Sequence, residues 1–468
     1  MKRICNSSLG LCLLLSGSFA YAAESQPAAA TAPAAAATAF LLPVIQFKGV
    51  GFAIPDLTAK QAEDEMPAIQ FSWENRIRNE SWNNSMDFSN AMDDQIVQMR
   101  YKEHAAFTYT SAPVDFMIGM DAELTKHMAL NNAEVAVDSF SNAMNMTGEM
   151  IFEYFNLNLK KLFIPGLSMK VGRQDFMKGE GFLFMDGTSG DGSRSSYYNM
   201  VDISYKHAKS QLELVGILDP QIDRFLPVVH RNNIKKEYLN EWDEQAVGLY
   251  YADRNRKNTD IDAYYFLKKE IHERDYPNTS YQFQPDRHIN TLGGRVVERA
   301  PRGFTFSGEY AAQWGAQHAN TSTGTIKGTG VVNPVTGVFI PALSAAQPAK
   351  DIAAMGGSAY VNKSFNVGRW NPYLQVGYIG YSGSDYKNNP NKIGNFDPLF
   401  ARWPHYSEMY LYSLVPEIGV GYWTNNNLTK LEVGMNPKIP HMKSFTIRGT
   451  VYDEYANHPF MPGAAALV

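Results

Sequence analysis

The sequence predicts an all-β protein: a single transmembrane antiparallel β-barrel of about 16–18 strands, with long outer loops and short periplasmic turns. Three observations predict this fold. Apolar residues recur with a period of two from Ala68 onward, and the connections between these runs alternate between long and short. After the N-terminus, no segment holds the roughly eighteen consecutive apolar residues of a spanning helix. A chain that crosses a membrane without such helices satisfies its backbone in lipid only as a closed barrel.

The N-terminal residues 1–23 have the order of a secretory signal peptide. Lys2 and Arg3 are followed by the apolar run Leu9 to Leu15 and by the small-x-small cleavage site Ala20-Tyr21-Ala22. The apolar run is too short to cross a bilayer, so we expect secretion and cleavage rather than a helical anchor. An ordinary buried N-terminal helix is the alternative.

Residues 24–67 are predicted to be a periplasmic leader. Pro27 to Ala39 contains only Ala, Pro and Thr, a composition that cannot build a packed core. Val44 to Pro55 is either an extra first strand or a plug-like segment. Both cysteines of the chain, Cys5 and Cys12, lie inside the signal peptide, so the mature chain has none.

Residues 68–468 are predicted to form the barrel itself. Ile69, Phe71 and Trp73 alternate with polar residues, which places one set of side chains on each face of a strand. Longer alternating runs occupy residues 114–124 and 304–314, and a run of about ten residues matches a tilted barrel strand in lipid. Similar runs end near Tyr109, Lys160, Gln174, Lys206, Leu218, Asp253, Leu267, Val297, Val361, Tyr381, Tyr422, Met435 and Asp453.

The connections between these runs have a regular rhythm. Short ones are predicted at residues 111–113, 161–166, 207–210, 254–259, 299–303 and 366–369, and longer ones separate them. Outer-membrane barrels alternate in this way, whereas a soluble β-sandwich or propeller, the alternative fold, has no reason to do so. Continued along the chain, the same alternation makes Asn436 to Met442 an outer loop.

Two segments resemble the alginate export family of outer-membrane barrels. The first contains Gly172-Arg173-Gln174-Asp175, Lys178-Gly179-Glu180-Gly181, Arg194 and the strand from Val201 to Tyr205. The second contains Gly377-Tyr378, Ser382-Gly383, Asp385 and Gly394-Asn395-Phe396-Asp397-Pro398-Leu399-Phe400, close to the family's Phe-Asp-Pro-Leu-Phe signature. The resemblance extends through Asn436-Pro437-Lys438, which it makes a periplasmic turn.

The resemblance implies a channel that exports or passes an anionic polysaccharide, such as alginate, through a lumen lined with basic residues. Arg173, Lys178 and Arg194 match the family's strand-end and loop pattern, and a loop after a strand can fold into the pore as a constriction. Basic groups in a narrow aqueous pore lower the cost of moving uronate carboxylates. Alternatively, Arg173 only pairs with a neighbouring carboxylate such as Asp175 or Glu180.

Strand alternation predicts a lumen that carries charges of both signs. The candidate basic pore residues are Arg173, Lys178, Arg194, Arg100, Lys102, Lys170, Arg295 and Arg448, and their candidate acidic partners are Asp175, Glu180, Asp202 and Glu309. Asp202 stands where the family usually carries a basic residue. These charges form either cross-strand ion pairs that stabilise a hydrated barrel or a localised basic ring whose arginines are positioned by carboxylates. The register between strands decides between the two.

The sequence does not predict an enzyme. It lacks a Gly-x-Ser-x-Gly elbow, a phosphate-binding Gly-Lys-Ser/Thr loop and a His-Glu-x-x-His pair. No cofactor is expected; the Asp- and Gly-rich segment Asp186 to Ser193 leaves open a calcium loop, although it lacks the later glutamate of that pattern.

Three functions remain open: a polysaccharide or anion channel, a passive porin for small solutes, and a non-conducting barrel that acts as a surface scaffold. The expected location is the outer membrane of a Gram-negative cell. The expected partners are outer-membrane lipid, an anionic polysaccharide or small anionic solute, and periplasmic export components, with no nucleic acid.

Overall fold

The computed structural model describes most of the predicted barrel domain. The described residues are 68–83, 95–130, 146–160, 162–185, 197–220, 223–227, 229–230, 243–271, 285–320, 324–332, 339–344, 347–401, 424–440 and 445–458. The predicted signal peptide, the leader, the Asp186 to Ser193 segment and Arg194 therefore lie outside the described residues.

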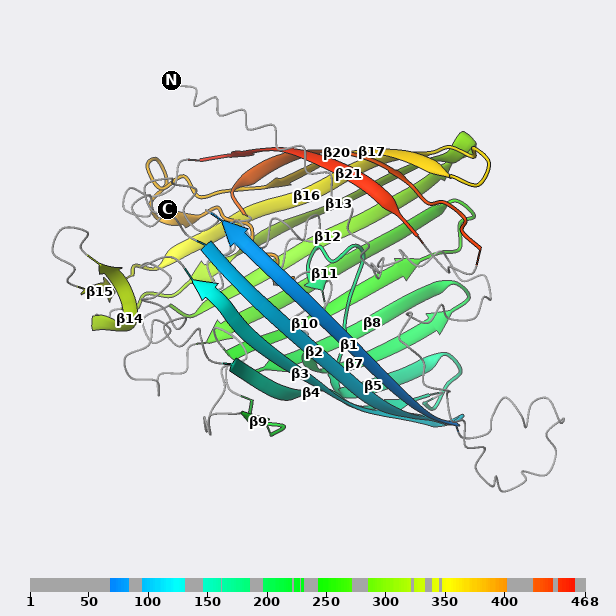
Figure 1. Cartoon of the computed structure of the whole chain (residues 1–468), viewed down its shortest axis with the longest axis horizontal. Helices are drawn as coiled ribbons and strands as arrows, with labels where there is room; N and C mark the ends of the chain where they lie inside the picture. Colours follow the sequence, from blue (N-terminus) through cyan, green and yellow to red (C-terminus); the bar gives the residue numbers. More distant parts are fainter. Residues whose placement is uncertain are drawn as a thin grey trace.

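The described residues form a 17-stranded sheet in which each long strand pairs antiparallel with the next one along the chain (Figure 1). Its first half contains β1 (Ala68–Asn83), β2 (Gln95–Thr110), β3 (Val114–Leu130), β4 (Met146–Leu159), β5 (Leu167–Gln174), β7 (Tyr198–His207), β8 (Ser210–Asp219) and β10 (Asp243–Asp253). Its second half contains β11 (Thr259–Ile271), β12 (Arg287–Ala300), β13 (Phe304–Gln317), β16 (Lys350–Ser364), β17 (Pro372–Tyr381), β20 (Asn426–Met435) and β21 (Ile447–Ala456). The two-residue strands β9 (Val229–His230) and β18 (Lys392–Ile393) pair with β4 and β16.

Burial follows the alternation that the sequence predicts. On β10 the side chains of Val247, Leu249 and Tyr251 are exposed, whereas Ala246 and Tyr250 are buried on the opposite face. The exposed set is apolar, as expected for a surface that faces lipid. The predicted short connections are also confirmed, because every second connection between the long strands is a short turn, such as the one that links β2 to β3.

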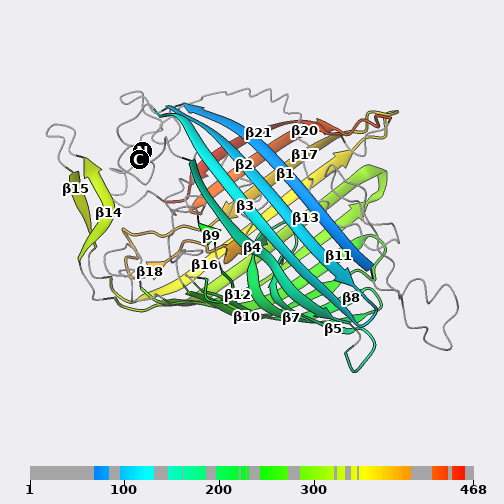
Figure 2. The same ribbon diagram turned by 60° about the horizontal axis from the view of Figure 1, so that its bottom comes forward.

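The sheet curls round on itself, so that β1 and β21 come to the same side of the molecule (Figures 1 and 2). The short turns lie at the right in Figure 1 and the long connections at the left, where β14 (Gly324–Val332) and β15 (Phe339–Ser344) form a separate hairpin. Pairings among the described residues do not join β1 to β21. The closed barrel of about 16–18 strands therefore stays a prediction.

Helical structure within the described ranges is limited to the 3-10 turn Pro301–Gly303. No helix in the described part of the chain is long and apolar enough to cross a membrane.

One prediction from loop parity is wrong. β17 pairs directly with β20, and β20 pairs with β21, so the connection between β20 and β21 lies at the short-turn end. There Asn436 N donates to Asn371 O at 3.2 Å, and Lys438 N donates to Arg369 O at 2.8 Å. The parity count includes a strand ending near Tyr422, in residues 402–423, which lie outside the described residues. The resemblance predicts this turn correctly.

Two connections that are distant in sequence meet inside the curled sheet. The connection after β5 contains β6 (Phe184–Met185), and the connection after β17 contains β19 (Phe400–Ala401); the two short strands pair in parallel. The Phe184 ring stacks on Phe400 at 5.4 Å and lies 4.6 Å from Phe266 on the inner face of β11. The main cluster of buried apolar residues is thus formed by the inner face of the wall and these two inward connections.

Candidate functional site

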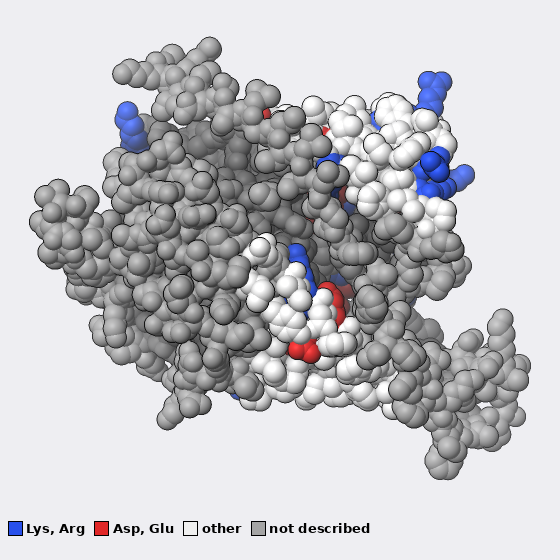
Figure 3. All heavy atoms as spheres, viewed as in Figure 1, with Lys and Arg blue, Asp and Glu red and all other residues white. Residues whose placement is uncertain are grey.

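The short-turn end of the sheet is rich in exposed basic side chains. Among the described residues in or beside these turns, the exposed basic ones are Lys206, Lys209, Arg256, Lys257, Arg302, Arg369 and Lys438. The carboxylates beside the same turns, Asp115, Asp253 and Glu298, are fewer and only partly exposed. In Figure 3 basic side chains stand out at the upper right, where the turns after β12 and β16 lie in Figure 1. We call these seven residues the basic rim.

A row of arginines and carboxylates rises from the basic rim along the inner face of the wall. Arg299, near the end of β12, has its Nη2 2.5 Å from Oδ2 of Asp260. Arg254, in the turn before β11, has its Nε 3.8 Å from the same oxygen and its Nη2 2.6 Å from Oδ1 of Asp262. Asp260 and Asp262 are two residues apart on β11, so they share the buried face of that strand.

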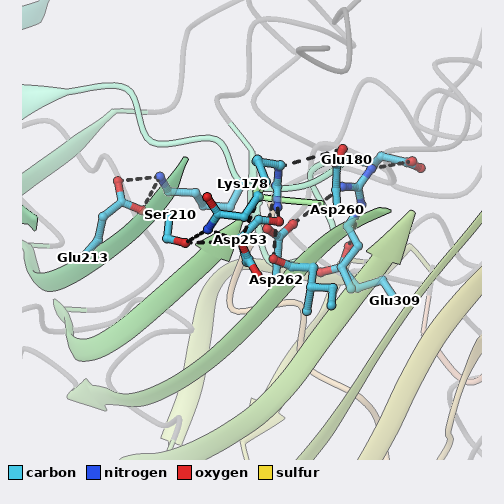
Figure 4. Close-up of polar contacts among 12 residues, drawn as sticks. Lys178, Glu180, Ser210, Glu213, Asp253, Asp260, Asp262 and Glu309 are labelled. Atoms are coloured by element: carbon cyan, nitrogen blue, oxygen red, sulfur yellow. Dashed lines mark hydrogen bonds and ion pairs between the residues drawn. The ribbon is translucent and has the colours of Figure 1, made fainter. Parts of the chain in front are cut away.

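Arg295 continues this row deeper into the molecule. Its Nη1 lies 3.6 Å from Oδ2 of Asp262, and its Nε lies 4.0 Å from Oε2 of Glu309. The register pairs Arg295 with Asp262 on β11 and with Glu309 on β13, which places the three side chains on adjacent strands. Tyr264 donates its hydroxyl to Oε1 of Glu309 at 2.9 Å. Below, the wall ladder means Arg299, Asp260, Arg254, Asp262, Arg295 and Glu309. Figure 4 labels its three carboxylates, Asp260, Asp262 and Glu309.

The connection after β5 adds one more carboxylate to the end of the wall ladder. We call Lys178-Gly179-Glu180-Gly181 the finger. Glu180 Oε1 accepts from Arg295 Nη2 at 3.1 Å, and Figure 4 shows Glu180 beside the stretch of wall that carries Asp260, Asp262 and Glu309. Lys178 Nζ lies 2.6 Å from Oε2 of Glu213 on β8, so the finger is held to the wall on both sides.

Backbone conformation and close packing both require glycine on either side of Glu180. Gly179 has φ +60° and Gly181 has φ +83°, values that side-chain-bearing residues rarely adopt. A Cβ at Gly179 would lie 3.0 Å from Glu309 Oε2 and 3.2 Å from Arg295 Cδ. The finger therefore presses directly against the wall ladder.

The second inward connection is fastened to the wall by a separate charged cluster. Asp397 Oδ2 lies 2.6 Å from Arg287 Nη2, and Arg287 also binds Glu270. Lys268 Nζ lies 2.8 Å from carboxylate oxygens of both Glu244 and Glu270. It also donates to Leu399 O at 2.6 Å and lies 4.6 Å from the centre of the Phe400 ring.

The Phe-Asp-Pro-Leu-Phe segment is thus an anchor rather than part of an open surface. Phe400 N donates to Leu183 O at 3.0 Å, which joins this segment to the first inward connection. Tyr198 donates to Phe400 O at 3.2 Å from the wall.

Arg173 is a buried wall residue, with 1% of its side chain exposed. Its Nη1 lies 2.7 Å from Oδ2 of Asp223, its Nε donates to Asn199 at 3.0 Å, and its guanidinium lies 4.0 Å from the centre of the Tyr197 ring. Arg173 therefore pairs with a carboxylate, as the alternative interpretation predicts, but the partner is Asp223 rather than Asp175 or Glu180. Asp175 accepts from Tyr154 at 2.5 Å, and Glu180 binds Arg295.

The other predicted pore residues are distributed over the wall. Lys102 Nζ lies 3.2 Å from Asp121 Oδ2, and Lys170 on β5 stands directly opposite Asp202 on β7. Arg448 is exposed on β21. Arg100 belongs to β2, but its side chain lies outside the description. The structure thus brings together Lys178, Glu180, Arg295 and Glu309 among the predicted residues. Asp202 interacts electrostatically with Lys178 and Lys170 on the other side of the finger.

Several members of the site were missed by sequence reasoning. Arg254 lies in a turn, where alternation says nothing about direction. Asp260 and Arg299 lie at strand ends, and Lys268 follows an apolar stretch of β11. Strict period-two counting from Asp262 would have placed Asp260 and Lys268 on the same inner face. In the described residues no group of three or more His, Cys, Asp or Glu side chains could hold a metal ion.

A sequence model described as alginate export matches residues 68–415. A comparison with curated proteins found no match.

Among solved structures, the chain is similar to OccAB1 of Acinetobacter baumannii, with 11% identity, a TM-score of 0.38, and coverage of 84% of this chain and 91% of that one. It is also similar to a BenF-like porin from Pseudomonas fluorescens Pf-5, with 11% identity, a TM-score of 0.34, and coverage of 84% and 95%. OccK8 (OprE) of Pseudomonas aeruginosa has 9% identity, a TM-score of 0.38, and coverage of 84% and 95%. Likenesses this weak say nothing about what the chain transports.

Proposed function

The chain belongs to the alginate export family of outer-membrane β-barrel channels, and on that premise we propose that it conducts an anionic polysaccharide, such as alginate, or a related anionic solute. The function is transport rather than catalysis. Periplasmic export components that deliver the polymer are proposed as partners on the side of the short turns, which lie in the periplasm in outer-membrane barrels.

One observation carries the proposal: the basic rim leads directly into the arginines of the wall ladder. Arg256 and Lys257 are exposed in the same turn as Arg254, and Arg302 follows Arg299 in the next turn. A mouth lined by one sign of charge concentrates oppositely charged solutes and guides them inward. A polymer carboxylate that reaches this rim next meets guanidinium groups at increasing depth, at Arg299, Arg254 and Arg295.

The carboxylates of the wall ladder are consistent with conduction of an anion. Conduction needs sites that bind well enough to admit the solute but weakly enough to release it. Asp260, Asp262 and Glu309 hold the guanidinium groups in place and offset part of their charge. A passing carboxylate then binds guanidinium groups whose charge is already partly compensated, so it can also be released.

Charge compensation along the ladder also favours a second candidate, a passive porin for small solutes. A lumen with both signs of charge passes small neutral and zwitterionic molecules without strong preference. A passive porin would therefore conduct ions, and oligouronates would reduce its current no more than neutral oligosaccharides do.

Planar-bilayer recordings of the purified mature chain test the proposal. Short soluble oligouronates should reduce the current at concentrations at which neutral oligosaccharides of equal length have no effect. Conductance that oligouronates leave unchanged would favour the passive porin. Absence of any conductance would instead favour the non-conducting scaffold.

A further inference from the structure

We propose that Glu180 acts as a stand-in for the carboxylate of the transported solute. It binds Arg295 when no solute is in the channel, and a uronate carboxylate replaces it during passage. The displaced Glu180 moves away from the wall together with its two flanking glycines, while Lys178 stays bound to Glu213, and the path widens. This inference rests on the proposed function, because it assumes an anionic cargo. It adds that Glu180 competes with that cargo for Arg295.

Glu180 differs from the other carboxylates around Arg295 in where it comes from. Asp262 and Glu309 project from strands of the sheet and have 1% and 8% of their side chains exposed. Glu180 comes from the inward connection, and 38% of its side chain is exposed. It is therefore the carboxylate that solvent, and a solute arriving in the lumen, can reach.

Distances to Arg295 make Glu180 the closest of the three carboxylates. Glu180 lies 3.1 Å from the guanidinium, compared with 3.6 Å for Asp262 and 4.0 Å for Glu309. If Glu180 leaves, Arg295 keeps both wall carboxylates, so the wall itself need not rearrange. Because the incoming group is also a carboxylate, the exchange leaves the charge at Arg295 unchanged and restores its charge-assisted hydrogen bond.

The finger has the construction that a displaceable group needs. Glycines on both sides of Glu180 give the backbone freedom to change direction there. The base of the finger stays fixed, because Lys178 binds Glu213 on β8 and its backbone N donates to Phe184 O at 3.3 Å. Movement at Glu180 is thus local and does not require the whole inward connection to unfold.

The variant Glu180→Gln tests this role with a nearly isosteric change. It removes the competing charge, so short oligouronates should block the current at about tenfold lower concentration than in the wild type. The open-channel conductance should also rise. Glu180→Asp, which retains the charge, should keep the blocking concentration within about threefold of the wild type.

Glu298→Gln is the matched control. Glu298 lies on β12, accepts from Thr259 at 2.5 Å and belongs to the face opposite Arg295. In about 1 M salt, which screens the charges of the basic rim, its neutralisation should leave the block unchanged. If Glu180→Gln and wild type are blocked at the same oligouronate concentration, Glu180 is not a stand-in, while the proposed function stands. If oligouronates block neither protein, the proposed function fails and this inference fails with it.

Discussion

Arg295 is the residue of the wall ladder that binds the finger. It binds Asp262 and Glu309 on the two neighbouring strands and Glu180 on the finger. Replacement by glutamine keeps much of the volume but removes the positive charge to which the proposed function assigns uronate binding. We expect Arg295→Gln to raise the blocking concentration of short oligouronates at least about tenfold, since charge-assisted hydrogen bonds contribute about 1.5–3 kcal/mol.

Bilayer recordings of Arg295→Gln and of Lys363→Gln provide the comparison. Lys363 lies at the short-turn end of β16, and its ammonium binds Arg302 O in the turn between β12 and β13. Both variants are compared in about 1 M salt, which screens the charges of the basic rim. Loss of one positive charge from the protein is common to both variants, so only the position differs. Equal block in both variants would mean that net charge, and not the ladder, determines affinity.

Substitution of Arg173 should affect the stability of the protein, because Arg173 and its partner Asp223 are both buried. Both Arg173 and Asp223 have 1% of their side chains exposed. Removal of one partner of a buried ion pair leaves an uncompensated charge, so Arg173→Met should destabilise the protein by about 3–5 kcal/mol. Urea unfolding of the protein in lipid or detergent measures this loss. Arg173→Met/Asp223→Leu, which removes both charges, should recover part of the lost stability. If it recovers none, the loss does not come from the unpaired charge of Asp223.

At the scale of elements, β6 and β19 hold the two inward connections together. Met185 and Ala401 are partners in this parallel pair, and the mature chain has no other cysteine, so Met185→Cys/Ala401→Cys offers a clean cross-link. If passage of a polymer requires these connections to separate, oxidation should abolish the oligouronate block while leaving small-ion conductance, and a reducing agent should restore the block.

Either single-cysteine variant is the control for the cross-link, since it carries the same change without the disulfide. An oxidised double variant that is blocked as readily as the reduced one would show that the cargo passes beside the joined connections rather than between them.

Alternation predicted the strands well because it is a local property. The runs that end near Gln174, Asp253 and Tyr381 end at those residues in β5, β10 and β17. Inter-strand and loop-to-wall contacts were not predictable in the same way, since they depend on register and on chain reversal. Arg173 pairs with Asp223 rather than with Asp175, two residues away. Lys268 binds a carbonyl that is 131 residues further along the chain.

Recognition of the Phe-Asp-Pro-Leu-Phe segment shows the same limit. Its sequence identified the family, but its role as an anchor came from contacts with Arg287 and Lys268 on the wall. For the same reason Lys178, Glu180, Arg295 and Glu309 could be proposed singly from sequence, yet nothing local indicated that they share one site.

At the scale of the whole molecule, charge is distributed unevenly along the axis of the curled sheet. The basic rim lies at the short-turn end, whereas the finger and the charged cluster around Lys268 and Arg287 lie deeper in the molecule. Electrostatic guidance by exposed charges acts over roughly 10 Å at 0.1 M salt and about 3 Å at 1 M salt. The rim should therefore accelerate entry of an anion from its own side only, and only at low ionic strength.

This asymmetry can be measured in single channels whose orientation is known. Asn366→Cys, in an exposed turn at the short-turn end, allows a membrane-impermeant thiol reagent to report which side faces each chamber. Oligouronate added on the turn side should block with an on-rate at least about tenfold higher than from the other side at 0.1 M salt, because steering by a charged surface raises association rates by about 10–1000-fold. At 1 M salt the two on-rates should converge.

The double variant Arg256→Gln/Lys257→Gln should reduce the difference between the two on-rates at low salt without changing the off-rate, since these side chains guide the solute and do not hold it. Equal on-rates from both sides at low salt would show that the basic rim does not guide anions into the channel. The affinity for the anion would then depend on the wall ladder and not on the rim.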